Sequence, residues 1–290
     1  MIGRRALIAG SAAALAVGCG PAREDLAITG DGLFDDLARK FGGGIGIAAL
    51  DTGSGRRIDF DSISRYAMCS TFKLPLAGMI LARNDAGVLQ LDEEIGFGPD
   101  DMVPYAPVTE RFLDRGAMTI AELCEAAVTL SDNVAANLLL RRIGGPGAFT
   151  QWLRSIGDTT TRLDRIEPAL NSNLPGDPRD TTTPGAMLDT VNKLVLGNVL
   201  APASRAGLAQ WAVACETGDN RLRAGLPDAW RIGDKTGTSA NGAANDVAIV
   251  WPPERPPFLI ACFIDCARVT AAERDAGHAE VARRILREFS

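Results

Sequence analysis

The chain has 290 residues, 46% of them hydrophobic, so it is long enough to bury one large core or two packed lobes that share a cleft. The formal net charge is -6, and no stripe of Lys and Arg offsets it, so the composition argues against a nucleic-acid partner. Six cysteines spread over this length do not indicate a dense disulfide framework.

The start of the chain has the pattern of an export signal. Arg4 and Arg5 precede an apolar run of small residues that is too short to span a bilayer. The paired arginines resemble a twin-arginine signal, and residues 15–19 loosely resemble a lipoprotein cleavage site that would make Cys19 the acylated mature N-terminus. We therefore predict an export signal over 1–19 and a periplasmic protein. Simple signal removal and a lipid anchor at Cys19 both remain open.

The following elements are predicted from hydrophobic periodicity. A short amphipathic helix pattern over 33–41 precedes two strand patterns, 44–50 and 56–60, and the Thr-Gly-Ser-Gly connection between them predicts a hairpin. The expected helices of the middle of the chain are 70–84, 119–130, 132–142, 148–156, 184–196 and 203–215. The expected elements of the last part are strands at 230–235, 246–251 and 258–265 and an amphipathic helix over 271–288.

Strands at both ends of the chain with helices between them predict an α+β variant of the α/β class. We expect an antiparallel five-stranded sheet flanked by the terminal helices, with an all-helical lobe inserted into it and a cleft between the lobes. The predicted catalytic domain is 26–290, with the sheet lobe at about 26–68 and 216–290 and the helical lobe at about 69–215. Residues 160–183 have no periodicity, which is expected of a functional loop packed on itself.

The single histidine restricts the acid–base chemistry that the chain can use. His278 lies in a charged helix pattern near the C-terminus, so we expect it at the surface, and zinc hydrolysis would have few ligands. No Gly-x-Ser-x-Gly elbow is present to supply the nucleophile of a Ser-His-Asp triad. The remaining option is a serine activated by a lysine or a carboxylate, with no metal and no cofactor.

Ser70 and Lys73 are the first candidates for such a pair. They are three residues apart at the start of a predicted helix, so the hydroxyl and the amine share one face. The positive potential of the helix N-terminus and the backbone N–H of Ser70 can stabilise the oxyanion that forms when a carbonyl is attacked. Ser-x-x-Lys also arises by chance, and on its own a capped surface helix is the alternative.

Two further motifs follow in the chain. Ser131-Asp132-Asn133 stands at a helix junction, and Lys235-Thr236-Gly237-Thr238 stands at the end of a predicted strand. Taken singly, they could be a helix N-cap and an ordinary turn. Their order and spacing relative to Ser70 resemble the active-site signature shared by class A β-lactamases and penicillin-binding proteins. This resemblance implies a β-lactamase/transpeptidase-like fold.

The segment without periodicity, residues 160–183, strengthens the resemblance to class A β-lactamases. Residues 162–171, which include Glu167 and Asn171, and residues 175–181 look like the class A Ω-loop, and with them the resemblance covers nearly all of the mature chain. It implies that Arg165 and Asp180 pin this loop as an ion pair. The alternative is a pair of solvated surface charges worth well under ~1 kcal/mol.

The resemblance also implies catalytic roles. Ser70 would be the nucleophile, Lys73 would help to manage its proton, and Ser131 would pass a proton to the leaving lactam nitrogen. Glu167 and Asn171 would hold the deacylating water, and whether Glu167 or Lys73 takes the first proton stays open. The implied substrate-binding residues are Asn133, Lys235, Thr236, Gly237, Thr238, Arg221 and Tyr105.

This sequence departs from the family pattern at its cysteines. Cys69 occupies a position that forms a disulfide in the carbapenem-hydrolysing subgroup, but Ser239 stands at the partner position. Cys124 matches one half of another disulfide of the family, whose other half is Ala77 in this chain. We therefore expect packing alone to hold the site.

Two other cysteines and the arginine that anchors the substrate also need comment. Cys262 and Cys266 are expected to be buried small hydrophobes, because they are too far apart along one strand to form a disulfide. Ala244 replaces the arginine with which many members anchor the substrate carboxylate, whereas Arg221 matches the alternative arginine of other members.

Three functions are compatible with these motifs: a β-lactamase, a D,D-peptidase of the same fold, and a penicillin sensor that acylates without turnover. Glu167 and Asn171 favour the β-lactamase, because the other two classes lack a base placed to hydrolyse the acyl-enzyme. The expected protein is a monomer that acts on small molecules, namely penicillins and cephalosporins, with carbapenems left open.

Overall fold

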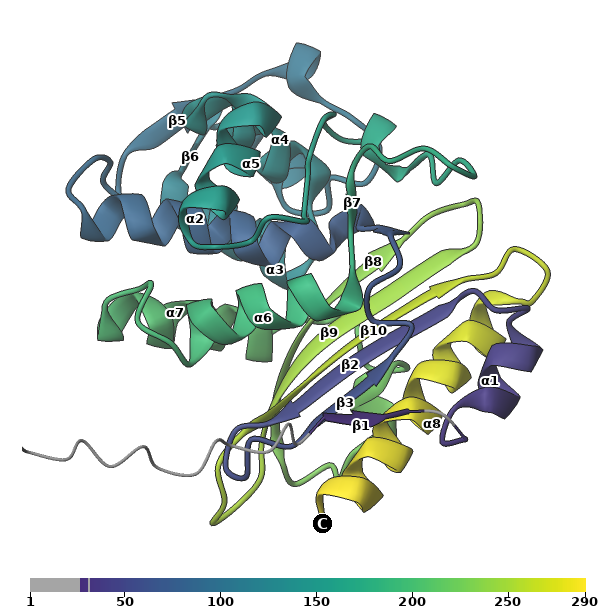
Figure 1. Cartoon of the computed structure of the whole chain (residues 1–290). Helices are drawn as coiled ribbons and strands as arrows, with labels where there is room; N and C mark the ends of the chain where they lie inside the picture. Colours follow the sequence, from purple (N-terminus) through teal and green to yellow (C-terminus); the bar gives the residue numbers. More distant parts are fainter. Residues whose placement is uncertain (1–26, 31) are drawn as a thin grey trace, which may run out of the picture.

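The computed structural model describes residues 27–30 and 32–290 (Figure 1). The predicted signal over 1–19, with Cys19, lies outside the described residues. A six-stranded sheet in the order β1-β3-β2-β10-β9-β8 forms the centre of the described part. Its strands are β1 (Ala27–Thr29), β2 (Ile45–Asp51), β3 (Arg57–Phe60), β8 (Arg231–Thr238), β9 (Ala243–Trp251) and β10 (Phe258–Asp265).

Five of these strands are the antiparallel sheet that the sequence predicts, including the β2–β3 hairpin. The sixth strand, β1, was not predicted: it pairs in parallel with β3 at the sheet edge and is only three residues long. β10 is buried on both faces, because alternate residues enter two different cores. Leu259, Ala261 and Phe263 face one core, and Ile260 and Cys262 face the other.

Helices cover both faces of the sheet (Figure 1). α1 (Asp35–Lys40) and α8 (Ala271–Phe289) lie on one face, and α6 (Pro184–Val195) contacts β2 and β10 on the other. The other helices on the side of α6 are α2 (Lys73–Asp85), α3 (Ile120–Thr129), α4 (Asn133–Ile143), α5 (Gly145–Ser155) and α7 (Pro202–Val213). No helix among the described residues combines the length and the apolarity needed to cross a bilayer.

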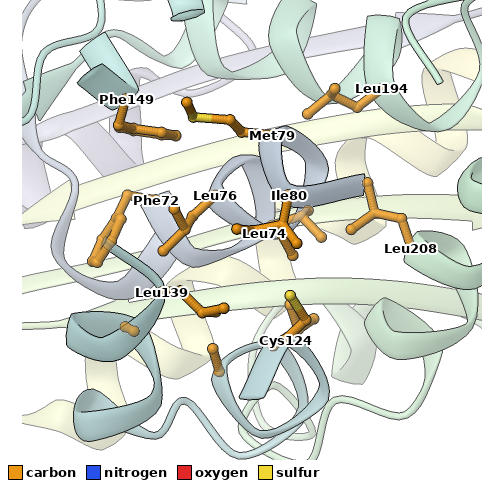
Figure 2. Packing of buried hydrophobic residues seen from close by; sticks show 14 of the residues in the cluster. Phe72, Leu74, Leu76, Met79, Ile80, Cys124, Leu139, Phe149, Leu194 and Leu208 are labelled. Atoms are coloured by element: carbon orange, nitrogen blue, oxygen red, sulfur yellow. The ribbon is translucent and has the colours of Figure 1, made fainter. Parts of the chain in front are cut away.

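α2 is the central helix of this second group, and every residue from 73 to 81 is buried. A helical segment that is buried on all sides lies inside a core, and Lys73 is the one charged residue of this segment. Figure 2 shows the side chains of and around α2 packed between the neighbouring helices; the labelled ones are Phe72, Leu74, Leu76, Met79, Ile80, Cys124, Leu139, Phe149, Leu194 and Leu208. The start of α2 is therefore fixed by the core.

The expected helix at 70 begins differently in the structure. Cys69–Phe72 forms a single 3-10 turn, and α2 begins at Lys73. Before this turn, β4 (Tyr66–Ala67) pairs with β7 (Thr181–Thr182) at the end of the Ω-loop. A third small sheet joins β5 (Glu94–Gly96) to β6 (Ala117–Thr119). These two- and three-residue strands are too short to give a periodicity in the sequence.

The expectation that His278 lies at the surface is wrong. Its side chain is completely buried, and Nε2 lies 3.0 Å from the carbonyl oxygen of Ala244, to which it donates a hydrogen bond. The reason is helical geometry. His278 stands three, four and seven residues before Val281, Ala282 and Ile285, so all four share the buried face of α8.

The five cysteines of the described residues are free and buried. Cys262 and Cys266 belong to the core between the sheet and α8, which confirms the expectation that they are buried small hydrophobes. Burial raises the pKa of the Cys124 and Cys262 thiols, so both stay protonated.

Candidate active site

The Ser70 hydroxyl lies on the 3-10 turn between β4 and α2, next to β8. Ser70 Oγ donates to Glu167 Oε1 at 3.3 Å. Gly237 of β8 passes so close that a side chain there would stand 2.6 Å from the carbonyl oxygen of Met68 and 3.1 Å from the backbone nitrogen of Ser70. Glycine at 237 therefore allows β8 to approach the turn that holds the candidate nucleophile.

Lys73 is surrounded by oxygen atoms at the bottom of the site. Its Nζ lies 3.0 Å from Glu167 Oε1 and donates to the carbonyl oxygen of Ser131 at 2.8 Å and to Asn133 Oδ1 at 2.6 Å. Burial lowers the pKa of Lys73, and the negative charge of Glu167 opposes that shift. Ser70 and Lys73 therefore meet at a single carboxylate oxygen.

Ser131 and Lys235 form a second buried pair. Lys235 Nζ donates to Ser131 Oγ at 3.1 Å and to the carbonyl oxygen of Thr236 at 3.0 Å. Burial lowers the pKa of Lys235 to about 8, so this lysine is close to half-charged in mildly alkaline solution. Ser131 itself has a φ of 58°, and the next residue, Asp132, caps α4.

Glu167 is positioned by residues from two directions. Asn171 Nδ2 donates to Glu167 Oε2, and the side chain of Asn137 bonds the Glu167 backbone twice, at 2.9 Å to the N–H and at 3.0 Å to the carbonyl oxygen. Asn137 is a site residue that the sequence motifs do not indicate. Its spacing of four residues from Asn133 places both amides on one face of α4, which was the available signal.

The ends of the Ω-loop meet at Asp180. Arg165 Nε lies 2.5 Å from Asp180 Oδ2, and Asp180 Oδ1 accepts the backbone N–H groups of Asp164 at 2.7 Å and of Arg165 at 2.9 Å. The Asp180 side chain is completely buried. The pair is therefore not a solvated surface contact, and Asp180 stabilises the backbone as well as the guanidinium.

These residues surround a cleft of about 300 Å³. The residues that line it are Ser70, Tyr105, Ser131, Asn133, Asn171, Thr217, Arg221, Thr236, Gly237 and Thr238. All except Thr217 were predicted, and Lys73, Glu167 and Lys235 are buried just behind the wall. Thr217 Oγ1 lies 2.5 Å from Thr236 Oγ1, which explains its place in the lining. Tyr105, 58% exposed, stands at the mouth.

Arg221 is held beneath β8 by four hydrogen bonds. Nε donates to Asp275 Oδ1 at 2.9 Å, and Nη1 donates to the carbonyl oxygens of Gly237 at 3.0 Å and Asn245 at 2.7 Å. Nη2 donates to Thr238 Oγ1 at 2.7 Å. Because that hydroxyl accepts from Arg221, its own proton is free to point into the cleft.

The expectation that packing alone holds the site is wrong. Ser239 does not form a covalent link to Cys69, but its hydroxyl is buried and donates to the carbonyl oxygen of Asn171 at 2.8 Å. A direct polar contact therefore joins the strand side of the cleft to the Ω-loop.

Comparisons with known proteins agree with this geometry. The model of the beta-lactamase enzyme family matches residues 33–289. The chain is 46% identical over 248 residues to the carbapenem-hydrolyzing beta-lactamase KPC of Klebsiella oxytoca, covering 85% of this chain and 83% of that protein. It is 44% identical over 260 residues to beta-lactamase L2 of Stenotrophomonas maltophilia, covering 89% and 86%.

Solved structures give the same result. An ancestral class A β-lactamase (GNCA) superposes with a TM-score of 0.87 at 54% identity, covering 89% of this chain and 98% of that one. A β-lactamase of Xanthomonas campestris superposes with a TM-score of 0.86 at 48% identity, covering 89% and 96%. The fold and the site thus define a serine hydrolase that acts on cyclic amides. The chain belongs to the class A β-lactamases and hydrolyses β-lactams.

Proposed function

We propose that Ser70 Oγ attacks the lactam carbonyl carbon and that its proton passes to Glu167 or Lys73. The lactam C–N bond then breaks, and the nitrogen receives a proton from Ser131, which is reprotonated with the proton taken from Ser70. Two contacts support these roles: Ser70 Oγ is 3.3 Å from Glu167 Oε1, and Lys235 lies 3.1 Å from Ser131 Oγ, where its charge favours proton release. The backbone N–H groups of Ser70 and Thr238 would hold the oxyanion.

Deacylation returns the enzyme to its starting state. Glu167 takes a proton from a water, the hydroxide attacks the ester carbonyl, and Ser70 leaves as the alcohol by receiving that proton back from Glu167. The observation that carries this proposal is Asn171. Its Nδ2 donates to Glu167, while its Oδ1 is buried and has no hydrogen-bond partner within the described residues. An unsatisfied amide oxygen beside a carboxylate is suited to accept a hydrogen bond from that water.

Substrate binding falls to residues that line the cleft. We assign the acylamino carbonyl to Asn133 and the carboxylate to Thr236, Thr238 and Arg221, with Tyr105 against the rest of the substrate at the mouth. Penicillins and cephalosporins are the proposed substrates. Hydrolysis of carbapenems, which the name of the Klebsiella relative states for that protein, is to be measured beside them.

The test is turnover by the mature chain from residue 20. A chromogenic cephalosporin, a penicillin and a carbapenem are each followed to completion, and Ser70→Ala is the inactive control. Release of D-alanine from a D-Ala-D-Ala peptide is measured in parallel. Turnover of a lactam without release of D-alanine supports the proposal. Stoichiometric acylation without turnover would identify a sensor instead.

Export and monomeric state are also proposals. The signal over 1–19 places the mature enzyme outside the cytoplasm, where it would protect the cell from β-lactam antibiotics. Labelling cells with a fatty acid separates the two forms of export. Label that is lost in Cys19→Ala identifies a lipoprotein, and a soluble unlabelled periplasmic protein identifies simple signal removal.

A further inference from the structure

Three consecutive residues of the Ω-loop are hydrogen-bonded to the turn that joins β8 to β9. Ser239 Oγ donates to the carbonyl oxygen of Asn171 at 2.8 Å, and Asn241 Nδ2 donates to that of Ser172 at 2.6 Å. In the opposite direction, Asn173 Nδ2 donates to the carbonyl oxygen of Asn241 at 3.0 Å. We call these five residues the clasp. It joins the Ω-loop to the β8–β9 turn, and these two segments lie next to each other (Figure 1).

The clasp is also braced from the sheet. Ser239 Oγ accepts the backbone N–H of Asn241 at 3.0 Å while it donates to Asn171, so its hydroxyl is used in both directions. Asn173 Nδ2 makes a second bond, at 2.8 Å, to Oδ1 of Asp265 at the end of β10. Side chains of the turn therefore hold the Ω-loop by its backbone at Asn171 and Ser172, and Asp265 holds it by the side chain of Asn173.

Asn171 is the residue that the clasp holds nearest to the reacting groups. Its carbonyl oxygen is bound by Ser239, its N–H donates to the carbonyl oxygen of Pro168 at 3.1 Å, and its side chain donates to Glu167. Hydrogen bonds to both peptide groups fix the position of the Asn171 backbone, from which the side chain extends. The direction in which Asn171 presents its amide therefore depends on Ser239.

We propose that Ser239 and Asn241 are positioning residues for deacylation. They contact neither the nucleophile nor its proton acceptors, and they act by keeping the Asn171 backbone where its side chain can hold Glu167 and the attacking water. The proposal rests on the proposed roles of Glu167 and Asn171 in deacylation. Acylation uses Ser70, Lys73 and Ser131, and none of these is part of the clasp.

The expected signature is a particular change in the steady-state constants. A slower deacylation step lowers kcat and KM by the same factor and leaves kcat/KM unchanged, because kcat/KM reports only steps up to acylation. We expect about a 3- to 10-fold decrease in the deacylation rate for Ser239→Ala, the range that corresponds to one lost hydrogen bond. Asn241→Ala should give an effect of the same kind, and Ser239→Thr, which keeps the hydroxyl, should restore the rate.

Rapid-quench mass spectrometry with a penicillin measures the acylation and deacylation rates separately. The matched control is Asn198→Ala, at an exposed asparagine after α6, which should change neither rate. A Ser239→Ala enzyme in which kcat falls at constant KM has merely lost folded protein, and this result would overturn the proposal. Unchanged rates would overturn it as well.

Glu167→Ala separates this proposal from the one on which it rests. If Glu167→Ala deacylates normally, the proposed function of the Glu167–Asn171 pair is wrong. If Glu167→Ala stays acylated while Ser239→Ala and Asn241→Ala deacylate at the normal rate, only the role of the clasp is wrong.

Discussion

The carboxylate of Glu167 and the ammonium of Lys73 form an ion pair that is entirely buried, with Oε1 3.0 Å from Nζ. The same oxygen accepts the hydroxyl of Ser70, so one atom links the candidate nucleophile, the lysine and the Ω-loop. Removing Glu167 therefore takes away the proposed deacylation base but leaves Lys73 bonded to Ser131 and Asn133.

We predict that Glu167→Gln, which preserves the shape of the side chain, still forms an acyl-enzyme but releases it about 10²- to 10⁴-fold more slowly, the usual contribution of a general base. Intact-mass spectrometry after brief mixing with a penicillin should show a persistent adduct, and Ser70→Ala should show none. Near-normal turnover with no adduct would mean that another group activates the water.

Replacing the buried Asp180 carboxylate should lower the stability of the protein. Asp180→Ala leaves Arg165 Nε and two backbone N–H groups without their acceptor, while Arg165 Nη2 keeps the Ser172 hydroxyl at 3.0 Å. We therefore expect a loss of about 2–4 kcal/mol, less than for a fully buried pair because Arg165 is partly exposed. Asp180→Asn should lose less, since it keeps an acceptor and tolerates the φ of 58° at this position. Thermal melting measures both losses, and deacylation should slow more than acylation. Equal melting temperatures for all three proteins would contradict the prediction.

We expect Arg221 to contribute to activity by binding the carboxylate of the substrate. We expect Arg221→Ala to lower kcat/KM about 10- to 100-fold, as for the loss of a hydrogen bond to a charged group. Arg231→Ala, at an exposed arginine at the start of β8, is the control. A cephalosporin whose carboxylate is esterified should show little difference between the unmutated enzyme and the Arg221→Ala variant. A loss of the same size for the ester would mean that Arg221 only supports β8.

The buried His278 should make the free energy of unfolding depend on pH. Burial lowers its pKa to about 3 from the ordinary 6.5, so between these values the unfolded chain binds one more proton than the folded protein. Its contribution is constant above about pH 6.5, and below that the free energy of unfolding should fall by about 1.4 kcal/mol per pH unit. His278→Gln keeps a donor for the Ala244 carbonyl and removes the titration. The difference between the two denaturation curves isolates this group, since the chain has one histidine. Parallel curves from pH 7.5 to pH 5 would refute the assignment.

The titration of Lys235 should make kcat/KM depend on pH. Burial lowers its pKa to about 8, so the ammonium is present below that pH and is lost as the pH rises above it. If the charge is needed to assist proton release from Ser131, kcat/KM should decline above about pH 8. Lys235→Arg retains the charge and should move this limb to higher pH, even if its activity is lower. An alkaline limb that does not move would assign the titration to another group.

Most of the architecture and the site could be predicted, because both depend on strong local signals. The five longer strands alternate or are continuously apolar, and the three catalytic motifs stand at the ends of elements whose periodicity is clear. β1 and the β4–β7 pair could not be predicted, because two or three residues carry no period. Their existence depends on tertiary contacts.

The two wrong expectations have different causes. The charges beside His278 in the sequence indicate a surface position, although its spacing from Val281 and Ile285 places it on the buried face of α8. Ser239 was judged by the disulfide it cannot form, and a hydrogen bond to a backbone carbonyl 68 residues away leaves no trace in a single sequence. Asn137 was missed for a related reason, since its partner is the backbone of Glu167.

The burial of α2 has a consequence for how this enzyme can diversify. No residue from 73 to 81 faces solvent, so a substitution there changes the core and lowers the stability of the whole fold. Tyr105, Ile166 and Leu174 are exposed and lie on loops, where replacement disturbs little packing. Selection for hydrolysis of a new antibiotic can therefore act on the loops that border the cleft, while the helix that carries Lys73 stays unchanged.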